Sequence, residues 1–527
     1  MGNKTEANQL RMDISYVKRK EILIVILCLL IGLALRFYTF EKKSLWIDEV
    51  HTFNDSAHNL QGLLEFYQAN PTYLHPPLFF VLTHQFYPFT KPERDLRVIP
   101  LIFGTLSIPM IYLLARQLFP PIAIPCALSL TLMTYHIYLS QDGRSYSLLL
   151  FLGMAGLYFF LRHLATSKNR YLMLVALFYA CSFYTSYCSL LFIVSSQMFW
   201  FYRVGHKGHR KLSSLLILNG LIFLLCMPWL LFIALSYHGQ PMMDPYQIRT
   251  PISLGDIVFG ILHDWAPHLP LLVASALLLA LFPFVSENRK NSLILLAVLF
   301  FPVIAVYLFC KLLNVYHFIT PRYFVNFLPV FFFALYLSLD AMEERLQKLR
   351  SLFRLKLIFT VFFIASSLII LPVYYRSEKQ DTRGLVTYLK NHLQDRDKIF
   401  IGSLGYIPGI LHYFGSFSND RFAIDLRQGK SERGIEFKLS FIYQDKIFAL
   451  YQSNDCCSRY TEDGSRLWII ADKNMAKRIK EKSPSVLKGY FDASFLNYNR
   501  FPTDASMYLF LWDPQSPGEK GIDIPIE

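Results

Sequence analysis

Charged residues are scarce in this chain. Only 17% of its 527 residues are Asp, Glu, Lys or Arg, whereas 54% are hydrophobic, with 47 Phe and 32 Tyr. This balance argues against a set of soluble domains and is typical of a membrane protein. Successive apolar stretches support that interpretation, because stretches of about 20 residues are long enough to cross a hydrocarbon core about 30 Å thick.

The chain also lacks the cysteine patterns of a disulfide-stabilised or zinc-binding protein. Cys456 and Cys457 are adjacent, and α-carbons about 3.8 Å apart are closer than an unstrained disulfide permits. The other six lie in or beside apolar runs, where small buried hydrophobic residues are expected: Cys28, Cys126, Cys181, Cys188, Cys226 and Cys310. The sequence therefore indicates neither a disulfide framework nor a zinc site.

The sequence shows no clear signal-peptide cleavage site, no repeat of fixed period and no low-complexity tract. Five basic residues precede the first apolar run, Glu21–Phe40, which is too long for a signal-peptide core and is predicted to be a retained first span. The net charge of +14 does not indicate nucleic acid as a partner. Much of the excess lies in short loops between apolar runs, where positive charge marks the cytoplasmic side.

Placing the basic loops in the cytoplasm predicts a polytopic α-helical membrane protein of about eleven spans with a cytoplasmic N-terminus. This topology requires Leu78–Phe89, which is apolar but only about a dozen residues long, to be an interfacial or re-entrant helix. If that segment crossed, every later loop would change sides and the basic loops would face outward. The predicted spans are Glu21–Phe40, Leu96–Leu118, Pro121–Leu139, Ser145–Leu161, Tyr171–Tyr184, Ser189–Tyr202, Leu215–Leu235, Leu269–Val285, Leu293–Leu312, Tyr323–Leu339 and Leu357–Val373.

From Arg376 the composition becomes that of a soluble protein. Alternating helix and strand patterns predict a small extracytoplasmic α/β domain at 375–527. It follows a transmembrane catalytic domain at 1–374, whose first external loop, 41–95, is large. The expected elements are helices at Gly384–Leu393 and Ile407–Phe414 and strands at Lys398–Ile401 and Arg466–Ile470.

Two adjacent carboxylates, Asp48 and Glu49, lie just beyond the first predicted span. An acidic pair at the mouth of a span is costly to leave unsolvated, so a functional site is the favoured interpretation. Adjacent residues of a helix point about 100° apart, and the two acids are therefore expected to divide roles, one as base or metal ligand and the other as orienter. The alternative is a helix N-terminal charge or a solvated pair in a loop.

Further polar residues fall on the same predicted side. His75 precedes Pro76 and Pro77, which stiffen the backbone and aim the imidazole. Asp142 and Arg144 lie between two predicted spans, with a helix cap and an interfacial arginine as the alternatives. Arg322 opens a returning span, where a guanidinium suits a phosphate-bearing ligand and snorkelling is the alternative. In the predicted outer loop Ser236–Pro267, five residues are too scattered to rank: Asp244, Arg249, Asp256, His263 and Asp264.

These residues resemble those of bacterial members of the GT-C superfamily, in the branch related to protein O-mannosyltransferases and the lipid A aminoarabinose transferase. The resemblance is most specific from Glu21 to about Arg162. It rests on motifs that occur in the same order and on one predicted side: Leu45-Trp46-Ile47-Asp48-Glu49, His75-Pro76-Pro77-Leu78, Ser140-Gln141-Asp142-Gly143-Arg144-Ser145-Tyr146, Pro321-Arg322-Tyr323 and Asp381-Thr382-Arg383-Gly384-Leu385.

The resemblance implies a membrane glycosyltransferase with a polyprenyl-phosphate sugar donor and a lipid, glycan or protein acceptor, acting at the extracytoplasmic face with inversion. Asp48 is then the base that activates the acceptor or orients it, Glu49 completes the acidic motif, and Asp142 is the second acid of the catalytic site. Many relatives have Gln-Glu-Ala-Arg where this chain has Gln141-Asp142-Gly143-Arg144, so the shorter acid shifts its reach.

The resemblance also predicts substrate-binding residues: His75, Arg144, Arg322 and Tyr323. Some relatives use a divalent metal ion, and no ligand set in this sequence demands one. The alternative functions are a multi-pass transporter or lipid flippase and a non-catalytic membrane scaffold. A transporter would favour charges within spans and matching halves with broken helices, whereas this sequence has few ionisable residues within spans and no inverted repeat.

Overall fold

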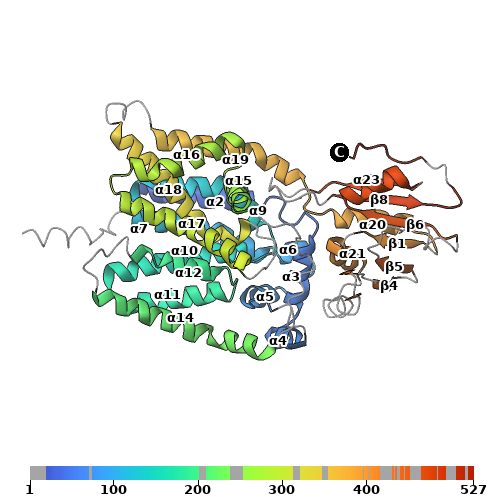
Figure 1. Cartoon of the computed structure of the whole chain (residues 1–527), viewed down its shortest axis with the longest axis horizontal. Coiled ribbons are helices and arrows are strands. Elements are labelled where there is room, and N and C mark those ends of the chain that lie inside the picture. Colours follow the sequence, from blue (N-terminus) through green and yellow to red (C-terminus); the bar gives the residue numbers. More distant parts are fainter. Residues whose placement is uncertain are drawn as a thin grey trace, which may run out of the picture.

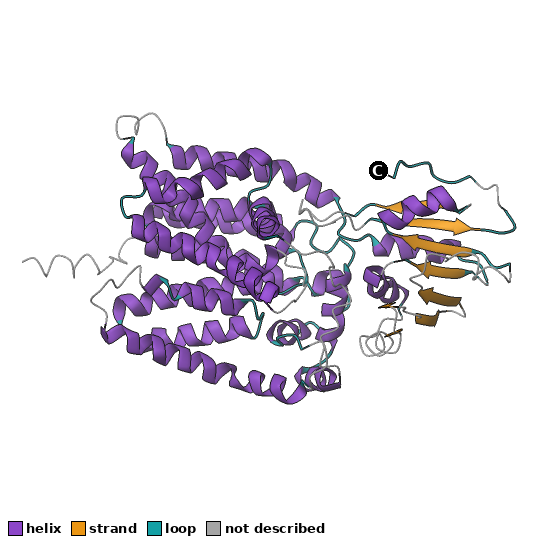
Figure 2. Cartoon of the chain, in the orientation of Figure 1, coloured by secondary structure: helices purple, strands orange, loops and turns teal. Residues whose placement is uncertain are grey.

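A helical bundle and, at one end of it, an α/β part make up the computed structural model (Figure 1). Figure 2 shows that the strands are confined to this second part. The structure describes residues 19–69, 74–200, 209–237, 253–312, 321–346, 354–395, 397–402, 404–415, 464–483, 485–493, 506–516 and 520–526, together with the backbone of four short strands between Lys430 and Leu450. Cys456 and Cys457 lie outside the described residues.

Apolar residues on most faces explain why the bundle helices pack into one large core. The bundle consists of α2 (Arg19–Phe37), α7 (Val98–Leu118), α8 (Ala123–Leu132), α9 (Thr134–Ser140), α10 (Tyr146–Thr166), α11 (Asn169–Phe183), α12 (Ser189–Ser196), α14 (His209–Ser236), α15 (Leu254–Trp265), α16 (Leu269–Val285), α17 (Arg289–Leu312), the short 3-10 helix η3 (Pro321–Phe327), α18 (Leu328–Arg345) and α19 (Leu355–Arg376). In an apolar 18-residue window of Pro321–Arg345 the buried share is 89%, whereas in such a window of Leu212–Ser236 it is 22%. The exposed Leu and Phe side chains of such outer helices suit contact with lipid.

Six helical stretches of the described chain are long and apolar enough to cross a membrane, and two bent helix pairs raise the number to eight if each pair is one span. The chain is thus a polytopic helical membrane protein, as predicted, while the number of about eleven spans stays a prediction. Two of the predicted spans, Tyr171–Tyr184 and Ser189–Tyr202, overlap α11 and α12, and the second span extends beyond the end of α12 at Ser196. These helices have 15 and 8 residues, fewer than the roughly 20 that a perpendicular crossing needs.

Four short helices of the loop predicted to be the first external one lie at the end of the bundle that faces the α/β part (Figure 1). They are α3 (Ile47–Ala57), α4 (Leu60–Ala69), α5 (Leu78–His84) and α6 (Pro92–Asp95). The segment Leu78–Phe89, expected to be interfacial, forms α5, whose seven residues are too few to cross a bilayer.

The C-terminal part is a six-stranded mixed sheet in the order β4-β5-β1-β6-β8-β7, with β1 parallel to β5 and β6. Its apolar residues form two clusters: one includes residues of α20 and α21, the other residues of α23. Two predicted elements, Lys398–Ile401 and Ile407–Phe414, match β1 and α21 residue for residue. The remaining elements are α20 (Thr382–His392), β4 (Leu439–Tyr443), β5 (Lys446–Leu450), β6 (Leu467–Ala471), α23 (Lys473–Lys482), β7 (Val486–Phe491) and β8 (Met507–Trp512), with β2 (Lys430–Ser431) and β3 (Gly434–Ile435) forming a separate pair.

Candidate active site

The acidic pair lies in the first turn of α3, where negative charge favours a helix N-terminus. Glu49 Oε2 accepts a hydrogen bond from the N–H of Trp46 at 3.4 Å, which reinforces the start of the helix. Because successive helical residues point in different directions, Glu49 is fully buried whereas the side chain of Asp48 is 30% exposed. The two acids therefore occupy different environments.

Glu49 is held by Arg97, which directly precedes α7. Its two carboxylate oxygens accept hydrogen bonds from Nε and Nη2 of Arg97, both at 2.7 Å, and Oε1 also accepts from the N–H of Gly143 at 2.6 Å. Arg97 further donates to the carbonyl oxygens of Phe40 and Lys43. Burial alone would raise the pKa of Glu49, but the Arg97 guanidinium holds this pKa below its usual value. Glu49 is thus an ionised group of α3. Through its ion pair with Arg97, it links α3 to the start of α7 and to the loop after α2.

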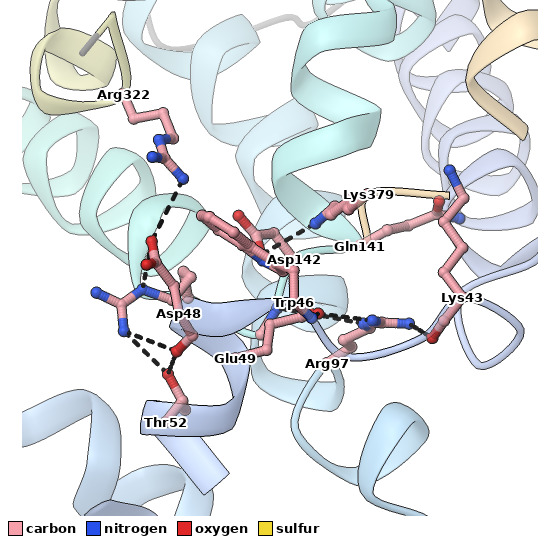
Figure 3. A network of polar contacts seen from close by, with 12 residues as sticks. Lys43, Trp46, Asp48, Glu49, Thr52, Arg97, Gln141, Asp142, Arg322 and Lys379 are labelled. Carbon is pink, nitrogen blue, oxygen red and sulfur yellow. Dashed lines mark hydrogen bonds and ion pairs between the residues drawn. The ribbon is translucent and has the colours of Figure 1, made fainter. Parts of the chain in front are cut away.

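Asp142 is also fully buried, and a residue far away in the sequence pairs with it. Its Oδ1 accepts a hydrogen bond from Trp46 Nε1 at 2.9 Å and lies 3.0 Å from Nζ of Lys379 (Figure 3). Lys379 itself is 1% exposed and belongs to the connector 377–381, which links α19 to α20. A buried carboxylate with a buried counter-ion is a stable arrangement only while both partners are present.

The connector 377–381 makes further contacts with the first external loop. Glu378 Oε2 accepts a hydrogen bond from the N–H of Ser44 at 3.0 Å, and Gln380 Oε1 accepts from the N–H of Ile47 at 2.9 Å. The start of α3 is therefore positioned partly by the C-terminal part of the chain. Sequence analysis missed Lys379, and its only signal was a short polar run directly after the last apolar stretch.

Asp48 lies between two arginines. Its Oδ2 is 3.6 Å from Arg322 Nη1 and 3.9 Å from Arg144 Nε. Arg144 is fixed in turn, because its Nη1 donates to the backbone oxygen of Asp48 at 3.2 Å and to Thr52 Oγ1 at 3.1 Å. Of the three predicted catalytic acids, only Asp48 has an exposed side chain, and its long ion pairs leave it available to other groups.

Arg322, on η3, is oriented by aromatic rings. Its guanidinium carbon lies 4.9 Å from the centre of the Trp46 ring and 5.3 Å from that of Tyr146. Such rings hold a guanidinium by cation–π attraction and leave its N–H groups free to donate. Nη1 of Arg322 is buried and has no hydrogen-bond partner. An anionic oxygen of a ligand beside Asp48 would accept a hydrogen bond from this Nη1.

The remaining predicted residues surround the same position. His75 is exposed, yet it interacts electrostatically with Asp48, Arg144 and His51, as expected for a side chain that lines a cleft. Tyr323 is half-buried and interacts electrostatically with Arg322 and Asp48. Four of the other predicted site residues, His75, Arg144, Arg322 and Tyr323, thus interact with Asp48, whereas Glu49 and Asp142 have buried carboxylates with partners of their own.

A metal ion does not fit this arrangement well. The nearest charged groups to Asp48 are arginines, which repel cations. Among the described residues, no group of three or more His, Cys, Asp or Glu side chains is placed to hold a metal. The chemistry that these residues support is recognition of an anion by two guanidinium groups beside an accessible carboxylate.

Comparisons with known proteins bear on the family and the fold of the chain. Residues 74–232 match the model of the family described as dolichyl-phosphate-mannose-protein mannosyltransferase. The structure is similar to that of ArnT from Cupriavidus metallidurans in the apo state, with a TM-score of 0.54 at 11% identity, covering 93% of this chain and 97% of that one. This likeness shows a shared fold.

Two further similarities are weaker. ArnT from Cupriavidus metallidurans bound to undecaprenyl phosphate gives a TM-score of 0.49 at 10% identity, covering 94% of this chain and 98% of that one. The Archaeoglobus fulgidus oligosaccharyltransferase in complex with Zn and sulfate gives a TM-score of 0.49 at 16% identity, covering 92% of this chain and 72% of that one. No curated protein sequence matches the chain.

Proposed function

We propose that the chain is a membrane glycosyltransferase of the GT-C superfamily and that it transfers a sugar from a polyprenyl-phosphate-linked donor to an acceptor. The family match over residues 74–232 and the fold shared with ArnT support this proposal. The reaction takes place at the extracytoplasmic face, where the α/β part also lies, and the N-terminus is cytoplasmic. The observation that carries the proposal is the accessible Asp48 carboxylate beside the ring-held Arg322 guanidinium, 3.6 Å away. The Asp48 carboxylate accepts a proton from the acceptor, and the Arg322 guanidinium binds an oxygen of the donor phosphate.

The proposed mechanism is a single displacement. Arg322 and Arg144 bind the donor phosphate and stabilise the charge that grows on it as the bond to the sugar breaks. Phosphate is a good leaving group and needs no strong general acid, whereas a hydroxyl or amine acceptor benefits from a base. Asp48 takes that proton as the acceptor attacks from the opposite side. We expect the anomeric centre to be inverted, since both oxygens of Glu49 are bonded to Arg97 and the buried Asp142 is paired with Lys379.

Transfer of a radiolabelled sugar from a polyprenyl-phosphate donor, measured in proteoliposomes, tests the proposal. We expect label to move from the carrier to an acceptor. A flippase would instead carry the intact labelled donor across the bilayer, with the sugar still attached to its carrier. That result would support the alternative function and contradict the proposed one.

Replacing Arg322 by alanine is expected to raise the donor KM by about 10- to 100-fold, because a hydrogen bond to a charged group contributes about 1.5–3 kcal/mol. Arg322→Lys keeps the charge but loses the planar fork, and it should recover only part of the loss. Arg94→Ala is the control, since Arg94 is 39% exposed and pairs with Asp95. Steady-state rates measured at varied donor concentration give the donor KM. An unchanged donor KM in Arg322→Ala would show that Arg322 does not bind the donor.

Asp142 and Lys379 are proposed to position Trp46, and through it Arg322, rather than to transfer protons. We expect Lys379→Met to lower kcat/KM and thermal stability because it leaves a buried carboxylate uncompensated. The double variant Asp142→Asn, Lys379→Met should be more active and more stable than Lys379→Met alone, with a coupling energy of about 0.5–3 kcal/mol. Lys390→Met, at an exposed lysine of α20, serves as the control. Strictly additive effects would exclude a functional ion pair.

A further inference from the structure

Asp264, near the end of α15, is a buried acid without a partner. Its residue is 5% exposed, and neither of its carboxylate oxygens has a hydrogen-bond partner. The helix around it is well packed: Ile257 and Ile261 are buried, and the Trp265 ring lies 5.3 Å from that of Phe331. The carboxylate is therefore held in place by its helix, although nothing in the described chain satisfies it.

Such a group is expensive to keep. A buried polar group that loses its partner destabilises a protein by about 1–3 kcal/mol, and a charged one by more. A hydrophobic residue at this position would avoid that penalty, and an asparagine would at least leave no charge to bury. The persistence of a partnerless carboxylate in a rigid helix therefore points to a ligand that supplies the missing hydrogen bonds.

The surroundings of Asp264 belong to the candidate active site. Asp264 interacts electrostatically with Arg322 and with Tyr135 of α9. The hydroxyl groups of Tyr135 and Tyr138 are buried and also lack hydrogen-bond partners, as does Nη1 of Arg322. Among the described residues, unsatisfied donors and acceptors from α15 and α9 thus interact electrostatically with Arg322, which pairs with Asp48.

We propose that Asp264 and the Tyr135 hydroxyl bind hydroxyl groups of the donor sugar while Arg322 holds the donor phosphate. This inference rests on the proposed function and adds the sugar subsite to it. Sugar hydroxyls donate and accept hydrogen bonds, which matches a buried carboxyl group and a buried phenol that both lack hydrogen-bond partners among the described residues. The acceptor approaches from the exposed side, at Asp48, whereas the donor sugar occupies the buried one.

The first test measures stability without any ligand. We expect Asp264→Asn to raise the melting temperature in detergent by about 1–3 °C, because it removes an unsatisfied carboxylate. Asp256→Asn is the matched control on the same helix, since the Asp256 carboxylate accepts a hydrogen bond from Ser253 Oγ at 2.7 Å. A lower melting temperature for Asp264→Asn would mean that Asp264 stabilises the fold, and the proposal would be wrong.

The second test compares a sugar-bearing donor with the bare carrier. Asp264→Leu is expected to lower kcat/KM for undecaprenyl phosphate-linked sugars by at least about tenfold, while inhibition by undecaprenyl phosphate, which lacks a sugar, stays unchanged. An equal loss with both ligands, or no loss with either, would overturn the sugar subsite. If the wild-type protein binds undecaprenyl phosphate but transfers none of a panel of linked hexoses and pentoses, the proposed function itself fails, and the inference fails with it.

Discussion

Asp48→Asn is expected to lower kcat by about 10²- to 10⁴-fold, the contribution typical of a general base. Asparagine has nearly the same size and still accepts a hydrogen bond, but it does not take up a proton from the acceptor. The donor KM should not rise, because Arg144 and Arg322, which face Asp48 at 3.9 and 3.6 Å, lose a competing anion and keep their charge for the phosphate. Initial rates of sugar transfer in proteoliposomes measure both quantities.

Folding should be almost unaffected by this change. The Asp48 side chain is 30% exposed and its ion pairs are long, and pairs of this kind contribute little to stability. An equal melting temperature for wild type and Asp48→Asn would therefore separate lost chemistry from lost structure. Glu65→Gln provides a control in the same external loop, since Glu65 lies on the exposed side of α4. If Asp48→Asn kept more than about a tenth of the wild-type kcat, Asp48 would not be the base.

Rules that need only neighbouring residues, such as helical periodicity, predicted how some residues of the candidate site are oriented. Helical periodicity alone implied that Asp48 and Glu49 diverge, and the structure shows one exposed and one buried. The same rules did not reveal what surrounds Glu49 or Asp142. Ser44 and Glu378 are bonded across 334 positions, and no pattern within a window of the sequence reports such a contact.

Contacts between residues that are distant in the sequence also explain which parts of the fold were not predicted. Short apolar and amphipathic segments of the C-terminal part, such as Lys398–Ile401 and Ile407–Phe414, were located by period and length. The strand order was not, because β1 lies between β5 and β6 through pairings distant in sequence. In the bundle, hydropathy indicates how long an apolar segment is, but not whether its helix bends. Hydropathy predicted a single span at Pro121–Leu139, where the structure has two helices, α8 and α9, with a bend of 60° between them.

Arg97→Met is expected to destabilise the protein by about 3–5 kcal/mol, since it leaves Glu49 charged, buried and unpaired. Unfolding in detergent, followed by fluorescence or by loss of the monodisperse peak in size-exclusion chromatography, measures this effect. Because the pKa of Glu49 is below its usual value in the folded state, the stabilisation by the pair is complete above the unfolded pKa. It is lost as the pH falls through the folded pKa, so the difference between wild type and Arg97→Met should shrink in acid.

The double variant Glu49→Gln, Arg97→Met tests whether charge or packing dominates. Removing both charges leaves no uncompensated ion, and we expect it to be more stable than Arg97→Met alone. It should not reach the wild type, because Arg97 also donates to the carbonyl oxygens of Phe40, Lys43 and Ser44, which then lose a donor. Lys91→Met, at an exposed lysine six positions earlier, is the control and should change stability little. If Arg97→Met were equally harmless, Asp48 would have to be positioned by other contacts, since Glu49 and Arg97 join its helix to α7.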